Sequence, residues 1–343
     1  MPEQRGPAAA AGAGDGESGH GQHAPAARDA VIADDAVHAV DVVRVVAPTE
    51  ARNPRTTALD RLPPLDVVRL ITVEDATVPA AVAAAAPQIA ALVELAVAAL
   101  RAGGRVHYAG AGTSGRLGAL DAVELPGTYG VASDRFVAHV AGGADAFRPG
   151  PHDLEDDAAA GERDLAGVAR EDLVVGISAS GRTPYVAGAL RRARATGART
   201  ALVSGDPGAA LAAEVDVHVC VETGAEVVTG STRMKAGTAQ KLVLHTLSTA
   251  TLVALGGTWS NAMVGVVATN AKLRGRALAL LVETTGRDEE DCAAALADAG
   301  GEVKVALVAL LRGVPVPRAR SALDAAGGVV HRALEQPLAG GAR

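Results

Sequence analysis

Two glycine-rich turns that carry hydroxyl side chains are the parts of this sequence best suited to chemistry. Each follows a short apolar segment, and they occupy residues 110–118 and 178–184. Glycines let the backbone approach a ligand closely, and the free N–H groups at the start of a following helix point toward an anion. A ligand that carries a phosphate and several hydroxyls, such as a sugar phosphate, would suit both turns. The residues that we assign to binding it are Thr113, Ser114, Ser178, Ser180, Gly181 and Thr183.

Other interpretations of the two turns stay open at this point. Residues 110–115 fit the pattern G-x-G-x-x-G, but Thr113 and Ser114 fill the turn. The acidic residue that a dinucleotide site places about 20 residues later is also missing. A tight turn without a ligand fits this stretch as well. In the second turn, Thr183 and Pro184 suit the N-cap and the first position of a helix, so plain capping is the alternative.

A third polar stretch covers residues 225–241. It combines hydroxyl, cationic, carboxylate and amide side chains around a predicted helix start. A capped helix needs one such group, so this density favours a ligand site. The residues that we assign to it are Glu226, Ser231 and Lys235.

Two carboxylates are candidates for proton transfer, although their spacing alone does not assign them to the site. Glu124 follows the predicted helix 115–123, and a helix of that length carries it away from the strand end. A role in the site would need the chain to turn back or a second subunit, and the alternative is a surface carboxylate. Glu155 opens the predicted helical stretch 155–169, where an acidic residue in the first turn is ordinary.

The elements that must position these residues alternate between strands and helices. The predicted strands are 105–109, 136–140, 173–177, 200–204 and 215–221. The predicted helices are 65–70, 87–101, 115–123, 155–169, 183–196 and 234–255. Such alternation favours a parallel sheet covered by helices on both faces. Ligands bind such sheets at the carboxyl ends of the strands, where both hydroxyl-rich turns lie.

The two ends of the chain differ from this central region. Residues 1–48 are rich in Ala, Gly, Asp, His and Pro and lack apolar periodicity, which predicts a disordered extension. From residue 284 the pattern favours a small domain of three short helices, 288–297, 303–311 and 317–323, punctuated by glycines. We therefore predict an extension, a central domain over 49–283 and a helical domain over 284–343.

Composition excludes several classes of function. The 343 residues carry a net charge of −7 and 2% aromatic side chains, which argues against nucleic-acid binding by charge or base stacking. Cys220 and Cys292 lie far apart without metal-ligand spacing, so we expect two buried thiols and no metal. Apolar runs fall short of the ~18 residues of a membrane span, and the N-terminus lacks the order of a signal peptide. We expect a cytoplasmic protein without membrane contact.

Beyond these general features, the chain resembles the bacterial N-acetylmuramic acid 6-phosphate etherases, which have the sugar-isomerase (SIS) fold. The resemblance runs from residue 49 to the C-terminus, and the motif at 226–241 is its most specific part. The matching segments are 49–54, 110–118, 178–185, 226–241, 247–249 and 268–273. It implies an α/β three-layer sandwich with a parallel sheet and a C-terminal helical module similar to ubiquitin-associated domains. It also implies a homodimer, with the site possible at the subunit interface, and no cofactor.

The resemblance also implies a reaction, the cleavage of the D-lactyl ether of N-acetylmuramic acid 6-phosphate in cell-wall amino sugar recycling. The products are N-acetylglucosamine 6-phosphate and D-lactate. The family's catalytic acid lies in a segment that reads Asp-Ala-Val-Glu-Leu-Pro here, so the resemblance assigns the acid to Glu124 and the base to Glu155. The chain departs from the family pattern at Ala144, Pro149 and Pro151, and His152 replaces an earlier family glutamate.

Two rival functions follow from the same architecture. A non-catalytic sugar-phosphate sensor related to the glucokinase regulatory protein would keep the phosphate turns without needing both carboxylates. The altered segment 144–152 favours this rival, whereas the presence of Glu124 and Glu155 speaks against it. A sugar-phosphate isomerase is the second rival, and the match at 226–241 argues against that function.

Overall fold

The computed structural model describes residues 47–148, 153–268 and 270–336. Its centre is a five-stranded sheet with the order β2-β1-β3-β4-β5, in which every neighbouring pair is parallel. The strands are β1 (Val106–Gly110), β2 (Phe136–Val140), β3 (Leu173–Ile177), β4 (Arg199–Ser204) and β5 (Val217–Cys220). The predicted parallel α/β architecture is confirmed.

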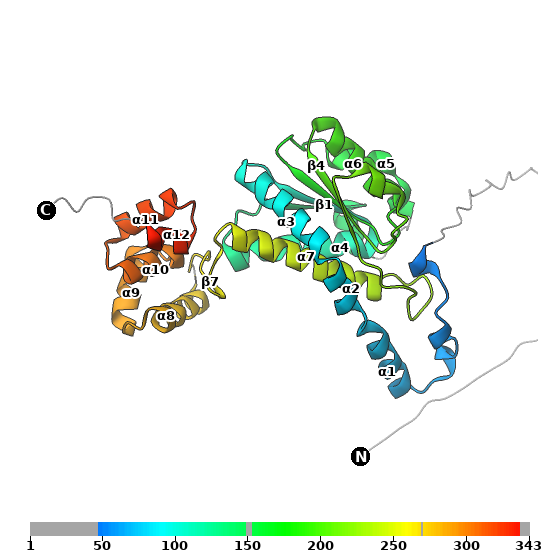
Figure 1. Ribbon diagram of the computed structural model, residues 1–343, viewed down its shortest axis with the longest axis horizontal. Coiled ribbons are helices and arrows are strands. Elements are labelled where there is room, and N and C mark those ends of the chain that lie inside the picture. The colour runs from blue at the N-terminus through cyan, green and yellow to red at the C-terminus, as the bar shows by residue number, and fades with distance from the viewer. Residues whose placement is uncertain (1–46, 149–152, 269, 337–343) are drawn as a thin grey trace, which may run out of the picture. The chain divides into compact units, whose positions relative to one another are not determined.

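Helices cover both faces of this sheet, which makes the predicted three-layer sandwich (Figure 1). The helices of this part are α1 (Pro64–Asp75), α2 (Val78–Ala84), α3 (Ala86–Arg101), α4 (Gly112–Tyr129), α5 (Ala158–Asp164), α6 (Pro184–Thr196) and α7 (Lys235–Ala254). One face packs on α3, α4 and α7, and the other on α5 and α6. Strands β1 and β3 are buried along their whole length, as strands covered on both faces should be.

Three predicted helices have wrong boundaries. Helix α1 continues to Asp75, beyond the predicted end at residue 70. Helix α4 does not end at residue 123 but continues through Pro126 to Tyr129. A proline inside a helix lacks the N–H that would bond the carbonyl four residues earlier, and for that reason it reads as a stop signal. The predicted helical stretch 155–169 is instead a turn of 3₁₀ helix, Asp153–Asp156, followed by α5. The side chain of Asp157 caps α5 by accepting a hydrogen bond from the Ala160 N–H at 2.8 Å.

The C-terminal part of the described chain is helical. It contains α8 (Ala271–Thr285), α9 (Glu289–Asp298), α10 (Val303–Arg312), α11 (Val316–Ala325) and α12 (Val330–Glu335). The three predicted helices correspond to α9, α10 and α11, and the six-residue α12 is an addition too short to show periodicity. Ala277 and Leu281 of α8 belong to the hydrophobic core that α9, α10, α11 and α12 also form. Helix α8 spans the predicted boundary between residues 283 and 284, and the division of the chain at that point stays a prediction.

Two further observations concern the predicted N-terminal extension and the possibility of a membrane-spanning helix. The predicted extension 1–48 lies almost wholly outside the described residues. Within the described residues no single helix is long and apolar enough to cross a membrane. One bent pair of helical segments, Pro64–Ala84 with Ala86–Arg101, would together be long and apolar enough, judged by length and composition alone.

Candidate active site

The turn after β3 is built around the hydroxyl of Ser178. This buried hydroxyl lies 2.8 Å from the Thr183 hydroxyl and accepts a hydrogen bond from the Gly181 N–H at 3.0 Å. Gly181 has a positive φ of 62°, and a Cβ on it would lie 2.3 Å from the Cβ of Ala209, so the position requires glycine. Thr183 precedes α6 but gives it no side-chain capping bond. The N–H groups at the start of α6 are therefore free of a side-chain cap, which favours a ligand over plain capping.

The turn after β1 brings the start of α4 against the strand end. A Cβ on Gly115 would lie 2.4 Å from the Gly110 carbonyl oxygen, so this close approach also depends on glycine. Ala111 at the N-cap supplies no side-chain hydrogen bond to α4. The hydroxyls of Thr113 and Ser114, both half-buried, make no hydrogen bond to any other described residue. Both predicted turns thus present hydroxyls and uncapped helix starts.

The two turns lie at the same edge of the sheet. β1 and β3 are neighbours, and their last residues, Gly110 and Ile177, are paired in register. The start of α7 joins them there, because a Cβ on Gly237 would lie 3.5 Å from the Thr113 methyl carbon. Helix starts carry partial positive charge, so this edge of the sheet favours an anion such as a phosphate.

Glu226 and Lys235, which the sequence assigns to ligand binding, are engaged inside the protein. The buried carboxylate of Glu226 accepts hydrogen bonds from the Lys235 and Ala236 N–H groups, each at 2.9 Å, and so caps α7. The Lys235 ammonium is buried and lies 3.1 Å from a carboxylate oxygen of Glu74. Ser231 lies half-buried in the loop before α7, and its N–H donates to the Val228 carbonyl at 2.9 Å.

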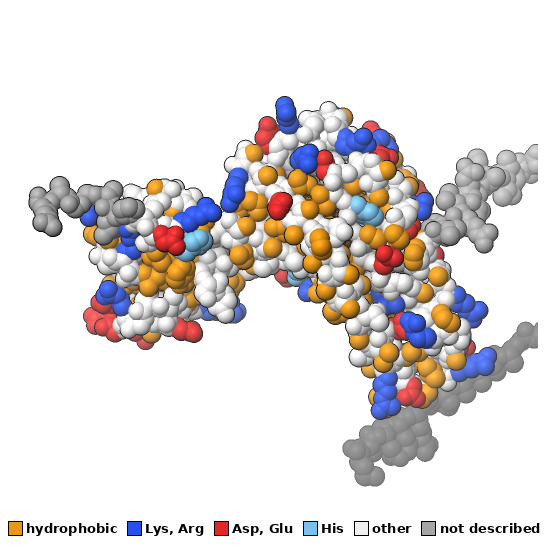
Figure 2. Space-filling model, in the orientation of Figure 1, with side chains coloured by type: hydrophobic (Ala, Val, Ile, Leu, Met, Phe, Trp, Pro, Cys, Tyr) orange, Lys and Arg blue, Asp and Glu red, His pale blue; other side chains and the backbone are white. Residues whose placement is uncertain are grey.

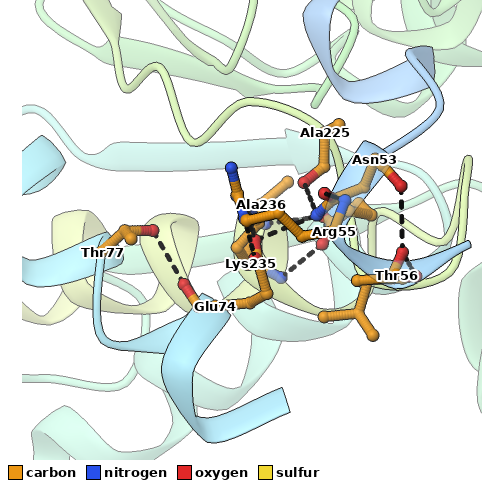
Figure 3. A network of polar contacts seen from close by, with 10 residues as sticks. Asn53, Arg55, Thr56, Glu74, Thr77, Ala225, Lys235 and Ala236 are labelled. Carbon is orange, nitrogen blue, oxygen red and sulfur yellow. Dashed lines mark hydrogen bonds and ion pairs between the residues drawn. The ribbon is translucent and has the colours of Figure 1, made fainter. Parts of the chain in front are cut away.

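Glu74 of α1 is the centre of a polar network that the sequence reasoning missed (Figure 3). Its buried carboxylate accepts hydrogen bonds from the side chains of Arg55, Lys235 and Asn53. The Arg55 hydrogen bond, opposed by burial and aided by Lys235 and Asn53, lowers the pKa of Glu74 to about 2. Through these contacts the segment after residue 49 fixes the loop that leads into α7.

Glu124 lies well away from the strand-end turns of its own chain. It stands twelve residues beyond the start of α4 at Gly112, or about 18 Å along the helix at about 1.5 Å per residue. Its side chain is exposed. Glu124 thus lies far along α4 from the turns of its own subunit, and its role in the site stays a prediction.

Glu155 lies in the 3₁₀ turn 153–156 and is exposed. The adjacent Leu154 packs on the chain just after β2, because its Cδ1 lies 2.5 Å from where a Cβ on Gly142 would be. That contact brings the turn close to the strand-end edge of the sheet. His152, Pro149 and Pro151 lie outside the described residues.

Another buried carboxylate, that of Asp121, precedes Glu124 by one helical turn. Its oxygens accept hydrogen bonds from the Tyr108 hydroxyl at 2.9 Å and the Ser248 hydroxyl at 2.8 Å. Burial raises the pKa of Asp121. Asp121 is the first residue of the segment that ends at Pro126. Its position in that motif was the one sequence feature that could have indicated a structural role.

Metal chemistry has little support among the described residues, which contain no group of three His, Cys, Asp or Glu side chains able to hold an ion. Cys292 is buried and Cys220 half-buried, and burial raises the pKa of the Cys220 thiol to about 11.

Comparisons with known proteins identify two matching domain families and a set of solved structures. Residues 147–250 match the SIS domain family, and residues 88–194 match the N-terminal SIS domain of the glucokinase regulatory protein. Among solved structures, a phosphoheptose isomerase from Francisella tularensis superimposes with a TM-score of 0.42 at 17% identity, over 55% of this chain and 98% of that one.

Curated relatives are more informative, because they match nearly end to end. An N-acetylmuramic acid 6-phosphate etherase of Thermobifida fusca is 60% identical over 80% of this chain and 90% of its own length. Enzymes of the same name from Cutibacterium acnes and Rubrobacter xylanophilus are 48% and 52% identical, over 87% and 83% of this chain and 98% and 95% of their own lengths. This chain belongs to the N-acetylmuramic acid 6-phosphate etherase family.

Proposed function

We propose that this protein is a carbon–oxygen lyase that cleaves the D-lactyl ether of N-acetylmuramic acid 6-phosphate. The products are N-acetylglucosamine 6-phosphate and D-lactate. The observation that carries the proposal is the 60% identity to an etherase over 90% of that enzyme's length.

The turn before α6 suits the phosphate. The Ser178 hydroxyl lies 3.5 Å from that of Ser180 and 2.8 Å from that of Thr183, beside an uncapped helix start. Hydroxyl and backbone N–H donors together satisfy the oxygens of a phosphate, and the helix dipole adds a favourable field. Thr113 and Ser114, on the adjacent turn, would then face the sugar.

The chemistry needs two groups of opposite role. The ether oxygen is a poor leaving group, but the open-chain aldehyde makes the proton at C2 acidic. A base removes that proton, the C3–O bond breaks as an acid protonates the departing lactate oxygen, and water then adds across the C2–C3 double bond. We assign the acid to Glu124 and the base to Glu155, and this mechanism uses no metal or nucleotide.

Glu124 can take this role if a second copy of the chain completes the site, so we propose a homodimer. The exposed fractions of two apolar side chains next to Glu124 on α4, Leu120 and Val123, are 44% and 72%. Apolar side chains also lie exposed on α1, among them Leu65, Val68 and Val73, and Figure 2 shows hydrophobic side chains over α1, α2 and α3. A partner subunit that covered the α4 side chains would take Glu124 out of water.

The sensor alternative keeps one supporting observation, the match of residues 88–194 to the glucokinase regulatory protein domain. The matches to the etherase relatives cover far more of the chain, and they point to one particular enzyme, so we favour catalysis. We place the enzyme in the cytoplasm.

One assay decides between these functions. The pure protein is incubated with N-acetylmuramic acid 6-phosphate, and D-lactate is measured with a stereospecific dehydrogenase. Release of D-lactate that is lost in Glu124→Gln supports the etherase. Saturable binding of the sugar phosphate without lactate would reject the etherase and establish the sensor.

A further inference from the structure

Lys304 occupies an unusual place among the C-terminal helices. It is the second residue of α10, and its side chain is half-buried. A cation near a helix N-terminus meets the positive end of the helix dipole, and partial burial removes part of its hydration. Among the described residues, the Lys304 ammonium makes no hydrogen bond or ion pair. The helix dipole and the partial burial thus both disfavour the positive charge of Lys304. No acidic side chain among the described residues forms an ion pair that would compensate for them.

The Lys304 side chain lines a cavity of about 190 Å³. The wall is formed by the valine-rich segment 264–267, by Val303 and Val305 on either side of Lys304, and by Gly328. Beside these apolar residues the lining also includes charged side chains, so the cavity has both an apolar wall and a polar one. Space of this size admits a molecule of a few heavy atoms.

Three other charged residues line the same cavity, and none neutralises Lys304. Arg320 and Glu302 are occupied with each other, with a shortest N–O distance of 2.8 Å. Asp324 is exposed and makes no ion pair with Lys304. Burial lowers the pKa of Lys304, and no acidic group opposes that effect. The cavity therefore carries an ammonium whose charge a bound anion would stabilise.

We propose that this cavity binds a small monocarboxylate, whose carboxylate pairs with the Lys304 ammonium while its short apolar part lies among the valines. The chemistry of the lining favours this class over a phosphate. Lysine binds a phosphate only as a point charge, without the bidentate geometry of an arginine fork, and Arg320 is already paired. D-lactate, a product of the proposed reaction, and acetate both have the required chemistry. The site does not depend on the proposed function, because binding is measured without turnover.

The test exploits the scarcity of lysine in this chain, which has four: Lys235, Lys241, Lys272 and Lys304. Lysine labelled with ¹³C at Cε is introduced into the full-length protein, and the Lys304 signal is followed by NMR as pH rises. The titration is repeated with D-lactate, acetate, phosphate and chloride at constant ionic strength. We expect a saturable shift of the Lys304 signal and a higher Lys304 pKa with D-lactate or acetate. The other three lysines serve as internal references.

Two variants make the result decisive. Lys304→Met should abolish the saturable shifts that the carboxylate causes in the backbone amides of Val303 and Gly328. Lys272→Met, which removes an exposed lysine of α8 in the same helical part, should leave them unchanged. D-lactate effective where acetate is not would identify the product as the occupant. An equal response to chloride, or shifts that persist in Lys304→Met, would overturn the proposal. A fall in the Lys304 pKa in Asp324→Asn without added carboxylate would also overturn it, since Asp324 would then be the partner.

Discussion

The hydroxyl of Ser178 lies 2.8 Å from that of Thr183, and this contact directs the N-cap side chain of α6 away from the helix that it precedes. A threonine at this position ordinarily caps the first turn. Here the Ser178 hydroxyl contacts the Thr183 hydroxyl and accepts a hydrogen bond from the Gly181 N–H. The start of α6 therefore has no side-chain cap and is left for a ligand. We therefore expect the turn to be organised for an anion before any anion binds.

Replacing Ser178 by alanine should weaken catalysis through loss of phosphate binding. A hydrogen bond to a charged group contributes about 1.5–3 kcal/mol, which corresponds to a fall of about 10- to 100-fold in kcat/KM. The rate of D-lactate release over a range of substrate concentrations gives this value, with most of the loss in KM. Ser321→Ala, an exposed serine of α11, is the matched control. An unchanged KM in Ser178→Ala would remove the turn from the phosphate site.

Glu226 is expected to act on stability more than on binding. Glu226→Ala would leave the Lys235 and Ala236 N–H groups of α7 buried without an acceptor. We expect a loss of about 1–3 kcal/mol in the free energy of unfolding, measured with urea. The exposed Glu222 lies four residues earlier, and Glu222→Ala should change stability by less than about 0.5 kcal/mol. Normal stability of Glu226→Ala with lost substrate binding would return Glu226 to the ligand site.

Glu74 links the stability of the fold to acid pH. Its pKa is about 2 in the folded chain, against an ordinary 4.5. The unfolded chain therefore binds more protons at acid pH, so the stabilisation is complete above about pH 5 and disappears as pH falls toward 2. The free energy of unfolding of the wild-type protein should exceed that of Glu74→Gln by about 3 kcal/mol at pH 7. Urea titrations at several pH values should show the difference shrinking below pH 5, and a constant difference would contradict the linkage.

A histidine pair on β1 and β2 should also make the fold less stable as pH falls, but for a different physical reason. His107 Nε2 lies 3.2 Å from the Asp172 carboxylate, and His107 Nδ1 lies 2.9 Å from His139 Nε2. With Asp172 as the acceptor, His107 donates from Nε2 and accepts from the His139 N–H, so the His107 ring is neutral. Burial, reinforced by the proximity of His107, lowers the pKa of His139 to about 4.

The unfolded chain should therefore take up protons on this histidine between about pH 6.5 and 4, while the folded chain does not. Stability present above pH 6.5 is lost as pH falls through this window. His139→Leu should flatten this part of the stability profile, measured by thermal unfolding at pH 7, 6 and 5. The control His331→Leu changes a histidine on α12, outside the pair. An equally steep profile in His139→Leu would locate the titration elsewhere.

The sequence supports the sheet and its binding edge because the relevant signals are local. Strands such as Leu173–Ile177 are apolar throughout and flanked by polar residues or glycine, and the turn chemistry after Ile177 is visible in four residues. Pro126 misled the prediction because its ring is tolerated within α4, where a local rule reads a helix end. The roles of Glu226 and Glu74 depend on tertiary contacts. Lys235 and Glu74 are 161 residues apart, and no local pattern encodes that ion pair.

The proposed homodimer leads to a test that needs no structure of the complex. If Glu124 of one subunit serves the turn at Ser178 of the other, then Glu124→Gln and Ser178→Ala damage different halves of each site. Mixing the two variants with subunit exchange gives heterodimers that contain one intact site and one site with both changes. With random exchange of equal amounts, activity should recover to about a quarter of the wild-type value per total subunit. Coupled D-lactate detection before and after exchange measures the recovery. The double variant Glu124→Gln/Ser178→Ala mixed with itself controls for residual activity, because its dimers have no intact site. Failure to recover although mass spectrometry shows heterodimers would mean that Glu124 and Ser178 act within one subunit, or that Glu124 takes no part.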